Sequence, residues 1–246
     1  MNILCPPRGR DWSRTAWILV GTIAVMVTLA LMGPEALAHG VSDKDKAYIQ
    51  SVSGVHALAY MYLGAKHMVT GYDHLLFLVG VIFFLYRLKE VVSYVTLFAV
   101  GHSVTLLVGV LFNIHASPYI IDAIIGLSVV YKGFDNLGGF ERVFGFEPNP
   151  RVAVLIFGFF HGFGLATKIQ ELAFSREGLL GNLISFNVGV EIGQFLALSM
   201  ILIVMTFWRQ TKSFGRSAIF ANGALMCAGF ILIGYQLSGL LEVTPS

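Results

Sequence analysis

The chain of 246 residues is 56% hydrophobic and only 12% charged, and its mean hydropathy is +0.76. Because soluble domains carry roughly 25% charged residues, this composition leaves too little polar surface for a water-soluble globule, and the long apolar runs are typical of membrane spans. The formal net charge of +2, without a basic cluster interleaved with aromatic residues, excludes a nucleic-acid-binding surface.

The N-terminus has the pattern of a cleavable signal peptide. A start containing three arginines is followed by an apolar run over residues 16–31, which Pro34 ends. Residues 36–38 offer the small-x-small pattern of a cleavage site. We therefore predict a signal peptide over residues 1–38 and a mature chain that begins at His39, outside the cytoplasm. Since the apolar run is slightly long for a signal, an uncleaved anchor is the alternative.

The rest of the chain is expected to hold a short extracytoplasmic or interfacial segment over residues 39–66 and a six-span membrane domain over residues 67–246. A span needs about 20 mostly apolar residues at a rise of about 1.5 Å each. The stretches that meet this requirement are 67–87, 91–112, 118–136, 152–170, 181–207 and 217–240. The predicted fold class is therefore all-α, a polytopic membrane helix bundle of about six transmembrane helices.

Loop charges predict the orientation, because Lys and Arg are enriched on the cytoplasmic side of a membrane. The loops after the first, third and fifth spans carry Arg87, Lys89, Lys132, Arg142, Arg151, Arg209, Lys212 and Arg216. The opposite side carries fewer basic residues, namely Lys44, Lys46, Lys66, Lys168 and Arg176. We therefore expect a bacterial inner-membrane protein whose mature N- and C-termini are both extracytoplasmic.

Polar residues inside the predicted spans are the functional candidates, because an unpaired charge costs several kcal/mol there. They are His67, Asp73, His74, His102, Asp122, His161, Asn187, Glu191 and Gln194. In a regular helix His67 and His74 share a face but lie about 10 Å apart. They therefore predict two successive metal stations rather than one chelate, unless Gly71 breaks the helix.

Depth in the membrane predicts that four of these residues converge. Counted from the outer edge of the membrane, the four residues lie roughly 10–15 Å deep. They are His74, His102, His161 and Glu191. The spacing of Glu191 also places it on one helix face with Asn187 and Gln194. We therefore predict one shared metal site in the outer half of the membrane. The alternative for any single histidine is a hydrogen bond that joins two helices.

The ligand types narrow the choice of metal. Imidazole and carboxylate suit nickel, zinc, cobalt, copper and iron, whereas an all-oxygen cage suits magnesium or calcium. The lack of paired thiolates argues against a structural zinc site. Asp73 or Asn187 is expected to hold a ligand imidazole through its second nitrogen. Asp122, Asn187 and Gln194 are further candidates for entry or orienting residues.

Four motifs resemble the HupE/UreJ membrane proteins. They are Gly-Tyr-Asp-His-Leu-Leu-Phe-Leu at 71–78, His-Ser-Val-Thr-Leu at 102–106, Phe-Gly-Phe-Phe-His-Gly-Phe-Gly at 157–164 and Phe-Asn-Val-Gly-Val-Glu-Ile-Gly-Gln at 186–194. The resemblance covers about residues 60–206 and implies a nickel permease or an accessory protein that supplies hydrogenase or urease maturation. It maps metal-handling roles onto His67, Asp73, His74, His102, His161 and Glu191. One departure is Asp122, where the family resemblance leads us to expect Glu.

Three function classes compete at this point. The leading one is a transporter of a divalent metal, which needs several weak sites along a path. His67, one level outside His74, favours such a path, and a mature His39 could capture the ion first through its α-amine and imidazole. The second class is an intramembrane zinc hydrolase, which needs a tightly bound metal with one open position. The third is a membrane assembly factor in which the polar residues only join helices.

Overall fold

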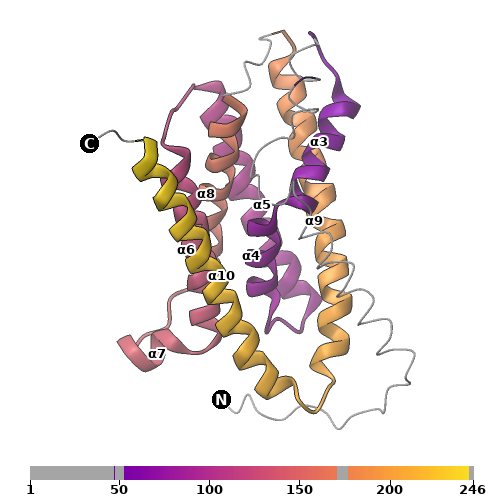
Figure 1. Cartoon of the computed structure of the whole chain (residues 1–246). Helices are drawn as coiled ribbons and strands as arrows, with labels where there is room; N and C mark the ends of the chain where they lie inside the picture. The colour runs from indigo at the N-terminus through magenta and orange to yellow at the C-terminus, as the bar shows by residue number, and fades with distance from the viewer. Residues whose placement is uncertain (1–46, 48–52, 171–176, 244–246) are drawn as a thin grey trace.

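The computed structural model describes residue 47 and residues 53–170 and 177–243, and every regular element in these ranges is helical (Figure 1). The predicted all-α class is therefore confirmed. The predicted signal peptide and His39 lie outside the described residues, as do residues 40–46 and 48–52 of the segment 39–66.

The first predicted span is two helices rather than one. Helix α3 covers Ala57–Thr70 and α4 covers Tyr72–Ile82, so the expectation of one continuous span over 67–87 is wrong. Gly71 separates them with φ −70° and ψ 98°, an extended conformation that no helix contains. A Cβ at this position would lie 3.0 Å from the carbonyl oxygen of His67, so the chain folds most easily here with glycine.

The later helices follow the predicted spans closely. They are α5 (Leu88–Leu111), α6 (Pro118–Asn136), α8 (Pro150–Gln170), α9 (Leu179–Arg209) and α10 (Phe214–Val243), with the short α7 (Gly139–Phe144) between α6 and α8. Four of them, α5, α8, α9 and α10, are long and apolar enough to cross a membrane. Helix α6 carries three charged residues and α4 is short, so the count of six spans stays a prediction.

The helices pack in three close pairs, α3 with α9, α5 with α8 and α6 with α10, and α4 lies among them (Figure 1). Small residues allow this close approach, as is usual between membrane helices. A Cβ at Gly64 of α3 would overlap the carbonyl of Phe186 in α9, and one at Gly162 of α8 would overlap the carbonyl of His102 in α5. These two contacts hold α3 and α5 in register with their partners.

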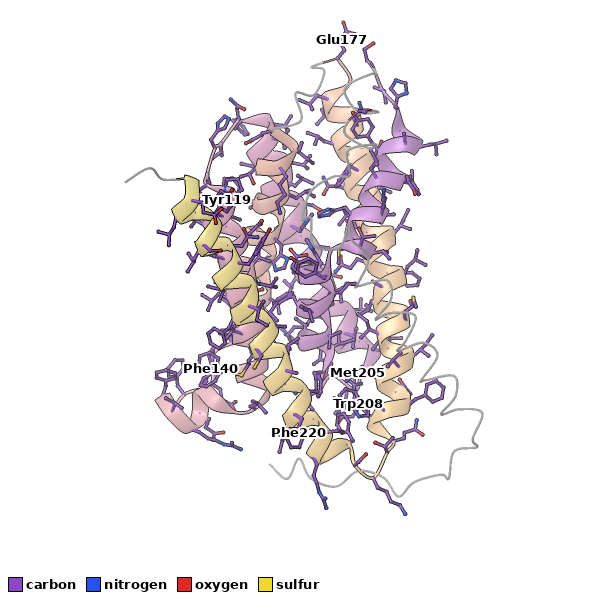
Figure 2. The ribbon with its side chains drawn as sticks, viewed as in Figure 1. Tyr119, Phe140, Glu177, Met205, Trp208 and Phe220 are labelled. Carbon is purple, nitrogen blue, oxygen red and sulfur yellow. The ribbon has the colours of Figure 1, made fainter. Side chains whose placement is uncertain are left out.

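Arg209, the last residue of α9, connects α9 to the end of α4 at one end of the bundle. Its guanidinium donates to the carbonyl oxygens of Phe83, at 2.7 Å, and Leu85, at 2.9 Å, and also to that of Ile82. These carbonyls belong to the end of α4, where helical partners run out. Trp208 lies at the same end of α9 (Figure 2), with its ring centroid 5.5 Å from that of Phe83. The far end of α4 is thus tied to α9.

Candidate metal centre

Three buried side chains from two helices gather beside the start of α4. They are Asp73 and His74 of α4 and His161 of α8, and one ligand atom from each lies within 4.8 Å of the others. Their exposed fractions are 2%, 2% and 0%. Two imidazoles and a carboxylate at this separation are able to bind one divalent transition-metal ion.

The break at Gly71 explains the position of Asp73 and His74. Because α4 begins at Tyr72, both residues lie in its first turn, where unpaired backbone N–H groups favour a negative charge. The Oδ1 of Asp73 lies 2.9 Å from Nδ1 of His74. A carboxylate in this position holds the proton on Nδ1 and leaves Nε2 with its lone pair for a metal. Within the described part of the chain, that Nε2 has no hydrogen-bond partner.

The same break brings His67 next to His74. Their ring centroids are 5.2 Å apart, so the separation of about 10 Å for a continuous helix does not apply, and the structure has the alternative in which Gly71 breaks the helix. Nε2 of His67 is buried and accepts or donates no hydrogen bond among the described residues. His67 therefore joins the edge of the same cluster and is no distant station.

His102 of α5 lies on another side of His74, with a ring-centroid distance of 5.8 Å. It is 1% exposed, and neither ring nitrogen has a hydrogen-bond partner in the described structure. A buried imidazole without partners costs free energy, so an interhelical hydrogen bond does not explain this histidine. Its ring rests against Phe98, which also contacts the rings of His74 and His161.

Ser128 of α6 orients His161, a role that the sequence reasoning missed. Its hydroxyl donates to the carbonyl of Ile125 at 2.6 Å, and its Oγ lies 3.2 Å from Nε2 of His161. Since the single hydroxyl proton is already used, Oγ accepts from Nε2–H. This assigns the lone pair of His161 to Nδ1. Spacing along the chain carries no signal for this contact, because the two residues are 33 positions apart.

Among the described residues, the buried group of possible ligands does not include Glu191, which the depth argument had predicted to lie beside the histidines. Glu191 is exposed on α9, whereas its neighbours on the predicted face, Asn187 and Gln194, are buried. The four residues from Asn187 to Glu191 turn the helix by about 40° more than a full turn. Glu191 therefore lies outside the face of α9 that packs on α3. Depth alone therefore overestimated how many ligands converge.

The predicted orienting residues have other partners. Asn187 donates to the carbonyl of Leu183 in its own helix at 3.1 Å, and Gln194 donates to the carbonyl of Val95 in α5 at 3.4 Å. Within the described residues, neither amide nitrogen donates to a histidine. Asp122 forms an ion pair with Lys168 instead of joining the histidine cluster. The predicted orienting contact to an imidazole is made by Asp73.

A family model described as HupE / UreJ protein matches residues 43–242. The chain belongs to the HupE/UreJ family. This family is associated with nickel or cobalt transport or an accessory function, and the match confirms the resemblance seen in the four motifs. No curated protein and no solved structure matched the chain significantly. Together with four apolar helices of spanning length, membership in the family identifies a multi-pass membrane protein.

The donor set suits the metals that the family handles. Neutral imidazole and carboxylate bind nickel and cobalt, and the absence of thiolates around His74 among the described residues disfavours a closed structural zinc site. The phenyl rings of Phe77 and Phe98 stand against the imidazoles, with centroids 5.2 and 5.1 Å from that of His161. An ion at this position would be held in a largely apolar shell, where electrostatic attraction is strong.

Proposed function

We propose that the protein moves a divalent transition-metal ion, nickel first, across a bacterial inner membrane, and that this ion supplies the maturation of a metalloenzyme such as hydrogenase or urease. The observation that carries the proposal is the buried group of Asp73, His74 and His161. A buried carboxylate–imidazole pair with a free imidazole nitrogen is the arrangement that proteins use to hold a metal.

The surroundings of His74 support transport rather than permanent storage. Its ring has three imidazole neighbours, His67, His102 and His161, at centroid distances between 4.8 and 5.8 Å. An ion bound to His74 can therefore exchange one neighbour for another in short steps. Conduction requires this kind of multi-site binding, strong enough for entry and weak enough for release.

Uptake of radiolabelled nickel into proteoliposomes tests the proposal. His74→Ala should abolish uptake, since His74 is common to every close imidazole pair at the centre. The matched control is His115→Ala, because His115 is exposed in the connection between α5 and α6. Equal uptake by the wild type and His74→Ala, with both proteins folded, would refute transport through this centre.

The ligand count also favours one alternative, an intramembrane zinc hydrolase. Three protein ligands with an open fourth position are typical of catalytic zinc sites. Metal analysis of the purified protein separates the two functions. Zinc bound tightly at one ion per chain, combined with no transport of nickel or cobalt, would support the hydrolase. Loosely bound metal that exchanges during uptake supports the transporter.

The proposed orientation places Lys212, in the turn between α9 and α10, in the cytoplasm. A Cys introduced at position 212 should react with a membrane-impermeant thiol reagent only after the membrane is opened. Ser117→Cys, at the start of α6, is the matched probe for the opposite side and should react in intact cells. Labelling of position 212 in intact cells would reverse the orientation.

A further inference from the structure

A second buried charge cluster lies between α6, α8 and α10, away from the histidines. The carboxylate of Asp122 is 7% exposed, and the ammonium of Lys168 lies 2.9 Å from one of its oxygens and 3.1 Å from the other. The side-chain amide of Gln236, in the C-terminal third of α10, donates to Oδ2 of Asp122 at 3.4 Å. Gly164 leaves room beside this carboxylate, because a Cβ there would lie 3.3 Å from Oδ1.

The cluster is displaced from the metal centre toward one end of the bundle. Lys168 follows His161 by seven residues of α8, which corresponds to about 10 Å along the helix. At this end Tyr119, in the first turn of α6 (Figure 2), packs against Gly239 of α10. In the proposed orientation this is the extracytoplasmic end, so the cluster lies closer to that side of the membrane than His161 does.

We propose that Asp122 and Gln236 form an outer cation station, that Lys168 is its built-in occupant, and that a divalent metal ion must displace this ammonium in order to bind. The inference rests on the proposed transport function. Two cations cannot share one buried carboxylate cheaply, because like charges a few ångströms apart repel strongly in a medium of low dielectric constant. Once the ammonium leaves, Gln236 can turn its amide to present the carbonyl oxygen as a second ligand.

The tethered ammonium makes the station selective for charge. Because Lys168 is attached to α8, it is present at a high effective concentration, and a monovalent cation from solution competes poorly with it. A divalent ion at the same distance interacts with the carboxylate twice as strongly. Lys168 thus acts as a specificity-determining residue that excludes sodium and potassium and admits the divalent cargo.

Equilibrium dialysis of the full-length protein in detergent against nickel chloride tests the proposal. Lys168→Met removes the competing charge and keeps the apolar stem of the side chain. Because the ion no longer has to break the hydrogen bonds from Lys168 to the carboxylate of Asp122, nickel binding should tighten about tenfold or a second ion should bind. The double variant Lys168→Met with Asp122→Asn should lose this gain. Lys168→Arg should bind nickel like the wild type.

A second lysine–carboxylate pair in the same helix bundle supplies the matched control. Lys132 and Asp135 of α6 are 2.6 Å apart, and the Lys132 side chain is as well buried as that of Asp122. Lys132→Met removes the same charge at the opposite end of α6, and nickel binding should not tighten. A gain of equal size in Lys132→Met would mean that any lost positive charge attracts the ion, and would overturn the proposal.

The unmodified protein provides a measurement that does not depend on the folding of a variant. Displacement predicts that nickel increases the reaction of Lys168 with a small amine reagent, read by mass spectrometry, while Lys132 is unaffected. Unchanged labelling of Lys168 under saturating nickel contradicts the proposal. A failure of the proposed function can be told apart from a failure of the outer station. If the histidine centre does not bind the ion, His74→Ala will leave nickel binding unchanged.

The double variant His74→Ala with Lys168→Met tests the outer station alone. Nickel binding that this variant has and the single variant His74→Ala lacks would belong to the outer station.

Discussion

The histidine cluster lies at the start of α4, and a polar network of the buried Asn222 and the half-buried Asn136 lies at its opposite end. The two regions differ in whether their buried polar atoms have hydrogen-bond partners. In the network Asn136 donates to the carbonyl of Gly80 and to Oδ1 of Asn222, each at 2.9 Å, and Asn222 donates to Ala218 at 2.9 Å. Around His74, buried imidazole nitrogens of His67, His74 and His102 have no hydrogen-bond partner among the described residues.

This difference distinguishes polar residues that stabilise the fold from polar residues that serve function. A buried network with its hydrogen bonds made stabilises the fold, whereas a buried polar group without a partner costs free energy and so indicates a role other than stability. Imidazole nitrogens that point to no protein partner are therefore best explained as ligands. Replacements in the two regions should accordingly change different quantities, metal binding in the first and stability in the second.

Among the replacements that compare the two regions, the largest change in nickel affinity is expected for Asp73→Asn. The amide cannot hold the proton of His74 on Nδ1 as firmly as a carboxylate does, and it removes a negative ligand. Loss of such an orienting carboxylate typically weakens metal binding about 10–100-fold. Nickel titration of the purified variant measures the change, and far-ultraviolet circular dichroism verifies the fold. A wild-type affinity would remove Asp73 from the centre.

The next largest change in nickel affinity is expected for His102→Leu. This variant distinguishes the two regions because nickel affinity and stability should respond differently. If both ring nitrogens of His102 are unsatisfied without metal, leucine should leave the unfolding midpoint in detergent unchanged or raise it. Nickel affinity should nevertheless fall by about tenfold, since one imidazole neighbour of His74 is lost. A variant that is both destabilised and fully able to bind nickel would assign His102 to helix packing.

Asn136→Ala should have the opposite pattern. It removes two hydrogen bonds and leaves the carbonyl oxygen of Gly80 and Oδ1 of Asn222 without this donor. Each such loss costs about 1–3 kcal/mol in a buried site. The unfolding midpoint in detergent should therefore decrease while nickel affinity stays unchanged. A weaker affinity at an unchanged midpoint would show that the network belongs to the ion path.

The smallest effect is expected for Glu191→Gln. Since Glu191 is exposed and is not part of the buried group with His74, the loss of its charge should alter nickel affinity less than about twofold, the level at which a change is below 0.5 kcal/mol. Asp73→Asn, which changes the same kind of charge inside the centre, is the matched comparison. A loss of affinity that equals the effect of Asp73→Asn would place Glu191 in the cargo path after all.

The sequence alone was sufficient for the coarse features. Low charge content and long apolar runs predicted an all-α membrane protein, and the four motifs led to the family that the model match confirms. The second to sixth predicted spans coincide with helices to within about three residues, because apolar runs and the prolines and glycines that end them are local properties of the chain. Burial of charge in apolar segments also identified the histidines as candidates.

The tertiary structure decided how these candidates are arranged. Whether Gly71 would break the first helix depends on the packing of α3 against α9 and of α4 against α6, and this break brings His67 and His74 together. The helical period alone did not exclude Glu191, because only the packed arc of α9 determines which side chains face inward. The ion pair of Asp122 with Lys168 joins helices 46 residues apart. Such contacts arise from the close packing of distant segments, and no local pattern in the sequence records them.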